Sequence, residues 1–514
     1  MPTPLSASAL AAAAAPSSVL DSAADSLANV SDHLYGQFLA WVLIAAGLYF
    51  TIRSRGVQFR HFGDMVKEIT GSRSSADDHE GGISSFQAFA IGLASRVGTG
   101  NIVGVAIAIT MGGPGAVFWM WVVALVGMAT GFIESTLAQI FKVRHHDGTF
   151  RGGPAYYITR GLGSRTWGSV FALVITFVFG FAYEATQANT IAATAHDTFG
   201  VEPWVTAIVL VVITAPIIFK GIKRVAGVAE WMAPLMALLY ALIAIVILVM
   251  NLGAIPTAIK EIIEGAFGLN QAFAGLSGGL YAAAINGIKR GLFSNEAGEG
   301  SVPNAAATAT TSHPVNQGFI QSMGVFVDTI VVCTATALIV LLSGVYTPAG
   351  ADADTAGVLT TASVTSQLGS WSQYLMAFIL FVFAYSSLLG NFTYAEVNMD
   401  FIRKGQSKHY LLRTMILVAI FIGSVASLTF VWNLSDVAMG CMATINIVSI
   451  TLLGKWAFGA LRDWEQQREA QKRGGIDVIR FVGTGNPNLP GDVPGDVWDG
   501  SASATNGGVT VEQG

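Results

Sequence analysis

The chain has 514 residues, of which 53% are hydrophobic and only 11% are charged. Soluble domains carry roughly 25% charged residues, so this deficit indicates a protein whose solvent is largely lipid. The net charge of −5 argues against a nucleic-acid partner. Two cysteines occur, Cys333 and Cys441, and both lie in apolar runs, so we expect neither a disulfide framework nor a cysteine-based metal site.

Polarity along the chain divides it into three parts. Residues 1–34 are rich in Ala and Ser and lack the basic start of a secretory signal, which predicts a polar, partly disordered leader. Residues 35–460 carry the apolar segments and are expected to form the transmembrane domain. Residues 461–514 are predicted to form a cytoplasmic C-terminal tail, solvated from Gly474 onward.

The apolar segments indicate an all-α polytopic membrane protein. A helix needs about 20 apolar residues to cross the roughly 30 Å core of a bilayer. This criterion predicts eleven spans, one preceding helix followed by ten core helices. They are expected at residues 37–54, 85–110, 114–142, 168–197, 203–219, 228–251, 273–297, 316–343, 374–402, 411–431 and 436–459.

The charge of the connecting loops gives an orientation. Lys and Arg gather in every second loop, for example at residues 53–67, 142–165 and 403–413, whereas the alternate loops are neutral or acidic. Basic loops stay on the cytoplasmic side. The alternation therefore predicts a multi-pass protein of a prokaryotic cytoplasmic membrane, with the N-terminus outside and the C-terminus inside.

The first core helix contains a run of poor helix formers at Gly98-Thr99-Gly100-Asn101. Non-helical backbone at membrane depth is tolerated where it is buried in protein or lines a cavity. In a transporter, the free N–H groups of a broken helix can hold a substrate carboxylate, and its free carbonyls can bind Na⁺. The alternative is close helix packing through small residues.

The sixth core helix has a second such run at residues 274–279, which includes Ser277, Gly278 and Gly279. Helices 1 and 6 hold corresponding positions in two halves of five helices each. Paired interruptions in corresponding helices point to an inverted repeat with a binding site at the bilayer midplane. These three residues are therefore candidate substrate contacts.

Ionisable side chains inside other spans are costly and mark functional positions. Arg96 needs a partner, and we expect an ion pair with Asp328, with Glu184 as the other candidate. The alternative is that its guanidinium reaches cytoplasmic water. Glu184, Asp328 and Glu396 could also relay protons, which keeps H⁺ coupling open beside Na⁺.

Several longer motifs resemble the alanine or glycine:cation symporter family, and the likeness runs over residues 35–460. They lie at residues 97–101, 111–116, 152–157, 291–298 and 327–334. The resemblance implies a LeuT-type 5+5 inverted repeat with one extra N-terminal helix. It also implies symport of alanine or glycine with Na⁺, and no organic cofactor.

The resemblance also implies site residues. The substrate would meet Thr99, Gly100 and Asn101 of the broken helix and Gln187 of helix 3. The sodium site would use the Ala94, Val97 and Phe383 carbonyls and the hydroxyls of Ser386 and Ser387. Arg96 stands where the LeuT pattern has a small residue beside a second sodium site, which suggests one Na⁺ per cycle.

Helix 8 departs from the family pattern at Asn391, where some members have Trp. The smaller amide leaves more room and adds a hydrogen-bonding group, so glutamine becomes an alternative to alanine.

Other function classes are less favoured. A channel would need a continuous polar pore, an enzyme a cluster of catalytic or metal-binding groups, and a receptor a further soluble domain. We therefore expect a transporter that is not an enzyme, with a small neutral amino acid and lipid as partners. The oligomeric state stays open, a monomer included.

Overall fold

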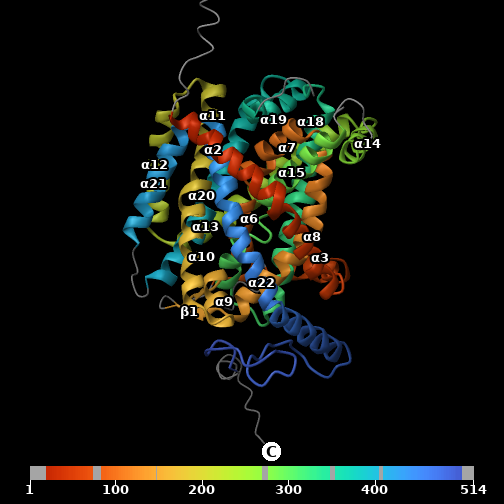
Figure 1. Ribbon diagram of the computed structural model, residues 1–514, viewed down its shortest axis with the longest axis vertical. Helices are drawn as coiled ribbons and strands as arrows, with labels where there is room; N and C mark the ends of the chain where they lie inside the picture. The colour runs from red at the N-terminus through yellow and green to blue at the C-terminus, as the bar shows by residue number, and fades with distance from the viewer. Residues whose placement is uncertain are drawn as a thin grey trace, which may run out of the picture.

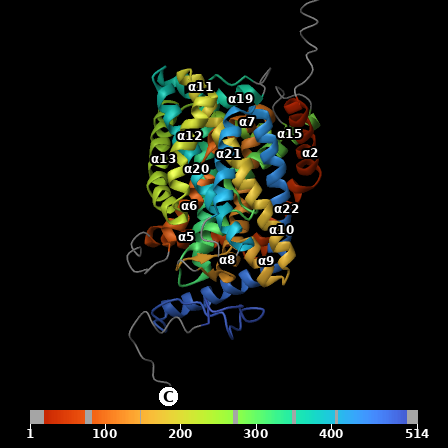
Figure 2. The same ribbon diagram turned by 90° about the vertical axis from the view of Figure 1, so that its left-hand side faces the viewer.

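A computed structural model describes residues 19–72, 83–145, 148–268, 276–347, 353–403 and 409–499 of the chain. These residues form an upright bundle of helices, with the C-terminal segment lying across one end (Figures 1 and 2). The short strands β1 (Val143–Arg144) and β2 (Phe150–Arg151) pair antiparallel near that same end.

The helices up to the middle of the chain are α2 (Val19–Leu34), α3 (Ala40–Arg53), α4 (Val57–Arg60), α5 (Phe62–Ser72), α6 (Ser85–Arg96), α7 (Val105–Gly112), α8 (Gly115–Ile140), α9 (Pro154–Gly161), α10 (Arg165–Phe177), α11 (Tyr183–Phe199), α12 (Pro203–Ile218) and α13 (Ile222–Met250). The later helices are α14 (Ile255–Ala266), α15 (Leu276–Asn295), α16 (Val302–Thr308), α17 (Pro314–Val325), α18 (Thr334–Leu342), α19 (Ala353–Leu368), α20 (Ser372–Ile402), α21 (Tyr410–Val425) and α22 (Leu428–Lys472). Four π-helical turns, Tyr35–Leu39, Gly100–Gly104, Val178–Ala182 and Phe326–Cys333, join neighbouring helices.

Among the described residues, seven continuous helices are long and apolar enough to cross a membrane, or eight if the bent pair α6–α7 counts as one span. The chain is thus a helical membrane protein. Each of the eleven expected spans coincides with a described helix, but α12 and α21 have only 16 residues each and α15 does not meet the same criterion. The count of eleven therefore stays a prediction.

The bundle brings α20 unusually close to α6. A Cβ added at Gly390 would lie 2.9 Å from the Cα of Ser95, so a larger residue would force the two backbones apart. Glycine at this crossing follows the general use of small residues where membrane helices touch. The contact places the middle of α20 directly against the end of α6, where the sequence predicts a break.

The second interruption lies elsewhere than predicted. Leu276–Gly279 belong to α15, and the chain leaves helical geometry only at Glu296–Ser301, between α15 and α16. Residues 274 and 275 lie outside the described part. The prediction failed because glycines near a helix start are tolerated, whereas Glu296, Gly298 and Gly300 adopt positive φ angles of 55°, 95° and 83° that an α-helix cannot contain.

The two interrupted segments pack against each other in opposite order. α7, which follows the first break, contacts α15, which precedes the second. α6, which precedes the first break, contacts α16, which follows the second. Both breaks therefore face the same region in the interior of the bundle.

The leader differs from its prediction over residues 19–34. Helix α2 occupies these residues, continues through Tyr35–Leu39 into α3, and packs along α22. The Asn433 amide of α22 donates to the Ala24 carbonyl at 3.1 Å. The side of α2 that faces the bundle carries mainly Ala and Leu, with Ala24 buried, and the other side is polar, so mean hydropathy alone does not reveal it. Residues 1–18 lie outside the described part.

The C-terminal tail is packed against the bundle as far as residue 499. The Trp498 indole is 8% exposed and donates to the Gln139 carbonyl at 2.9 Å. The Phe481 amide donates to the Ser312 carbonyl at 3.0 Å, and its ring meets that of Trp498 edge-on. The tail is thus docked at a few buried residues, Phe481 and Trp498 among them, while most of residues 474–499 are exposed as expected.

We predict that Trp498→Ala releases the tail from the bundle. Truncation of a buried Trp typically lowers stability by about 3–5 kcal/mol. Here the lost energy is that of the contact between the tail and the bundle. Hydrogen–deuterium exchange should therefore rise across residues 478–498 and stay unchanged in α8. Trp371→Ala, which removes an exposed indole elsewhere, is the control. Unchanged exchange in the tail of the Trp498 variant would contradict this docking.

Candidate functional site

The first interruption bends the span by 48° between Ser85–Arg96 and Gly100–Gly112. Helix α6 ends at Val97, whose ψ of 84° turns the backbone out of helical geometry. The freed Gly98 N–H is satisfied by the Asn101 Oδ1 at 3.0 Å. Asn101, in the first turn after the break, thus satisfies the N–H of a residue that precedes this turn, as the N3 side chain of a capping box does.

The Asn101 amide nitrogen connects the break to two other elements. It lies 2.6 Å from Asp328 Oδ1 and 3.0 Å from Ser294 Oγ, and all three residues are fully buried. The Asn101 carbonyl accepts from the Thr336 hydroxyl at 2.7 Å. This network fixes the position of the break relative to α15 and to the Phe326–Cys333 turn.

The opposite side of the break faces α11. The Thr99 N–H donates to Gln187 Oε1 at 3.3 Å, so the predicted helix 3 glutamine does reach the interruption. The Thr99 hydroxyl is buried and has no hydrogen-bond partner. A Cβ at Gly100 would lie 3.0 Å from the Phe293 ring, so glycine here lets the break pack closely against α15. The unsatisfied, buried Thr99 hydroxyl at the break is suited to a polar ligand.

The oxygens expected to bind Na⁺ converge at the end of α6. The Ser387 hydroxyl lies 2.9 Å from the Ala94 carbonyl and 3.0 Å from that of Ser95. The Ser386 hydroxyl lies 2.8 Å from the Phe383 carbonyl and 3.4 Å from that of Ala94. Carbonyls and hydroxyls are the neutral hard ligands that suit an alkali cation. Among the described residues, no hydrogen bond joins Val97 to either of these two serines.

Asn391 joins the same region from α20. Its Oδ1 lies 3.0 Å from the Ser95 hydroxyl, which also lies 2.8 Å from Glu296 Oε1. Its amide nitrogen is buried without a partner. Asn391 therefore lies between the two breaks, and its amide N–H groups are available to donate to a ligand.

The expected ion pair between Arg96 and Asp328 is wrong. The Arg96 guanidinium donates to the side-chain oxygen of Gln321 at 2.5 Å and to its carbonyl at 3.1 Å. Among the described residues, no carboxylate lies within 4.0 Å of it, which also excludes Glu184 as a partner in this structure. Arg96 is 3% exposed, so it does not reach water either. Neutral oxygens of Gln321 accept from both terminal nitrogens, whereas the buried Nε has no partner.

Ser277, Gly278 and Gly279 are the candidates that the structure does not bring to the site. About 15 helical residues separate them from Ser294, a rise of about 22 Å along α15. Their prediction depended on the misplaced second interruption.

Three residues of the region were missed by sequence reasoning. They are Ser294, Glu296 and Gln321. The run Gly298-Glu299-Gly300-Ser301 was the available signal for the true break, since two glycines flank a charged residue at membrane depth. Nothing local to Gln321 distinguishes it from the other amides of α17.

Solved structures with the same fold include a manganese transporter. A mutant of the Eremococcus coleocola manganese transporter aligns with a TM-score of 0.53 at 14% identity, covering 73% of this chain and 79% of that one. The same transporter in complex with an aromatic bis-isothiourea substituted compound aligns with a TM-score of 0.51 at 13% identity, covering 76% and 91%. At such low identity the likeness concerns the fold alone.

Curated relatives are far more similar in sequence. The amino-acid carrier protein AlsT of Bacillus subtilis is 45% identical, with 93% of this chain and 99% of the relative covered. The probable sodium/glutamine symporter GlnT of the same organism is 43% identical, covering 86% and 91%. The sodium/alanine symporter AgcS of Methanococcus maripaludis is 37% identical, covering 83% and 94%.

The family comparison covers nearly the whole membrane part of the chain. Residues 20–477 match the sodium:alanine symporter family, which confirms the resemblance drawn from the five sequence motifs. The relatives are transporters of amino acids rather than enzymes. This chain belongs to the sodium:alanine symporter family.

Proposed function

We propose that this protein takes up a small neutral amino acid, alanine or glycine, together with Na⁺ by alternating access. The observation that carries the proposal is the position of Ser387, whose hydroxyl lies 2.9 Å from the Ala94 carbonyl at the end of the broken helix. A cation held there touches the same interruption that Thr99 and Asn101 line from the other side. Substrate and ion would thus both bind to the interrupted α6–α7 segment.

The substrate site is assigned to Thr99, Gly100, Asn101, Gln187 and Asn391. The backbone of the break binds the substrate carboxylate. Gln187 and the Thr99 hydroxyl provide polar contacts beside it, and the Thr99 hydroxyl is without a partner in the protein. Asn101 acts mainly by holding the break open, since its amide is engaged by Asp328 and Ser294.

The ion site is assigned to the carbonyls of Ala94, Val97 and Phe383 and the hydroxyls of Ser386 and Ser387. Because α6 ends in the break that the substrate contacts, ordering of the break by one ligand favours the other. The resulting coupling is reciprocal by thermodynamic necessity. Arg96 holds α6 against α17 through Gln321, and a single Na⁺ per cycle is proposed.

The proposed topology has eleven spans, a 5+5 inverted repeat with one extra N-terminal helix, the N-terminus outside and the C-terminus inside. The opposed packing of the α6–α7 and α15–α16 segments supports the repeat. At the end of the bundle opposite the C-terminus, a cavity of about 410 Å³ lies between α11 and α19. It extends from exposed Asp197 to buried Val103 and Thr190, one helical turn from Gln187, and serves as the external approach.

The other end of the bundle is closed by hydrogen-bonded and aromatic contacts, which supports an externally open state. The His313 Nε2 lies 3.1 Å from the Asp463 carboxylate of α22, and the ring packs against Phe481 of the tail. Burial lowers the pKa of His313, so at neutral pH a neutral ring donates to Asp463. Opening this end requires these contacts to separate.

Two alternatives each have an observation in their favour. Glutamine as substrate is favoured by Asn391, whose unpartnered amide nitrogen can pair with a polar side chain. Proton coupling is favoured by Glu184, which is fully buried with both carboxylate oxygens unpartnered. A buried carboxylate without partners is more stable protonated, so it is a candidate proton carrier.

We predict that purified protein in liposomes accumulates labelled alanine under an inward Na⁺ gradient and not under a pH gradient alone. Ser386→Ala with Ser387→Ala should raise the half-saturating Na⁺ concentration by about tenfold or more, because each lost oxygen contact is worth about 1–3 kcal/mol. Ser424→Ala with Ser449→Ala is the matched control, since both hydroxyls bond only within their own helices. Uptake that ignores Na⁺ would refute the proposed coupling.

We predict that Asn391→Leu lowers glutamine uptake relative to alanine uptake by about tenfold, since an apolar side chain cannot pair with a substrate amide. Thr393→Val, which removes another buried unpartnered group of α20, is the control. The measurement is inhibition of alanine uptake by unlabelled glutamine. If the ratio of glutamine to alanine uptake is unchanged in the Asn391→Leu variant, Asn391 does not select the substrate.

A further inference from the structure

A second cavity, of about 750 Å³, lies where α3 and α22 leave the apolar part of the bundle. The tail closes it with Pro487, Asn488, Leu489 and Pro490. The Asn488 amide holds this segment to α22 through Gln466 at 3.0 Å. A Cβ at Gly459 would clash with the Asn488 carbonyl, so glycine here permits the tail to lie directly on the helix.

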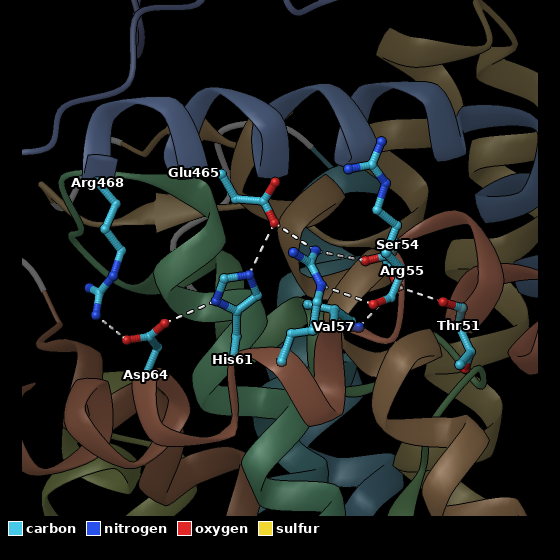
Figure 3. Close-up of polar contacts among 9 residues, drawn as sticks. Thr51, Ser54, Arg55, Val57, His61, Asp64, Glu465 and Arg468 are labelled. Atoms are coloured by element: carbon cyan, nitrogen blue, oxygen red, sulfur yellow. Dashed lines mark hydrogen bonds and ion pairs between the residues drawn. The ribbon is translucent and has the colours of Figure 1, made fainter. Parts of the chain in front are cut away.

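The lining of this cavity is strongly cationic. Its basic residues are Arg53, Arg55, Arg60, Lys455 and Arg462, and its only acidic residue is Glu465. The Glu465 carboxylate is already occupied, since Arg60 lies 2.7 Å and His61 3.0 Å from the same oxygen (Figure 3). Among the described residues, no carboxylate lies within 4.0 Å of the other four cations. The cavity therefore attracts an anion.

The cationic side chains are held in place by the turn after α3. Arg55 adopts a φ of +56°, a left-handed conformation that costs a non-glycine residue energy. The Arg60 guanidinium fixes this turn by donating to the Arg55 carbonyl at 2.9 Å and to the Ser54 carbonyl at 3.1 Å. In Figure 3 the Arg55 side chain extends toward α22, into the space that the cavity occupies.

Apolar surface adjoins the cations on the side of the bundle. Ile52, directly before Arg53, is 73% exposed, and Leu452, one turn before Lys455, is 64% exposed. Both helices thus change from an exposed apolar residue to a basic residue beside the cavity, a change that is typical of the boundary between lipid chains and headgroups. A dissolved anion would use the cations but leave this apolar surface uncovered.

We propose that this cavity binds the phosphate of an anionic phospholipid, with the acyl chains along the exposed apolar faces of α3 and α22. Basic pockets between membrane helices on the cytoplasmic side are the expected sites for such headgroups. The bound lipid joins α3, α22 and the tail at the end of the bundle that closes in this structure. The site is separate from the amino-acid site and does not depend on its assignment.

The test is a titration of the full-length protein in detergent with short-chain phosphatidylglycerol, short-chain phosphatidylcholine or inorganic phosphate, with binding measured by native mass spectrometry. Phosphatidylglycerol should bind at least about tenfold more tightly than phosphatidylcholine. The variant Arg55→Gln, Lys455→Gln, Arg462→Gln should lose at least about tenfold in phosphatidylglycerol affinity.

The matched control neutralises Arg165, Lys220 and Arg224, three exposed cations outside the cavity, and should bind as wild type. Equal melting temperatures without lipid will show that both triple variants are folded. Wild-type affinity in the Arg55, Lys455, Arg462 variant would overturn the proposal. Inorganic phosphate that displaces phosphatidylglycerol at equal concentration would also overturn it, because the cavity would then serve a dissolved anion.

Discussion

The fold depends on how an interrupted helix satisfies its backbone at membrane depth. Water is absent there, so every freed N–H and carbonyl needs a partner from the protein or from a ligand. Asn101 supplies one solution, accepting from the Gly98 N–H while its amide nitrogen contacts Asp328 and Ser294. In the proposed mechanism, the remaining groups of the break bind the cargo, with Ser386 and Ser387 beside them. Stability and function would then use the same few residues.

The second interruption obeys the same constraint with different chemistry. Its Gly298 N–H donates to the buried Glu134 carboxylate at 3.1 Å, and the Gly298 carbonyl accepts from the Asn446 amide at 2.9 Å. Glu296 accepts from Ser301 within the interruption and from Ser95 at the end of α6. This contact joins the two breaks directly. In the proposed alternating-access mechanism, it would couple the movements of the two segments.

The sequence was most informative where composition and local chemistry agreed. The Gly98–Asn101 break was predicted from poor helix formers at membrane depth, and the approach of Ser386 and Ser387 to α6 from the family resemblance. The partner of Arg96 could not be predicted from the sequence, because Gln321 differs from other buried amides only by its position in the folded chain. The docked tail was likewise hidden, since two aromatic residues among many polar ones leave no periodic signal. Helix α2 was missed because its apolar face consists largely of alanine.

The central proposal is that substrate and Na⁺ share the interrupted α6–α7 segment. Calorimetric titration of the purified protein with alanine, in NaCl and in choline chloride of equal ionic strength, measures this sharing directly. Na⁺ is predicted to tighten alanine binding by a factor in the usual range of about 5–150, and alanine to tighten Na⁺ binding by the same factor. Equal alanine affinity in the two salts would contradict the shared segment.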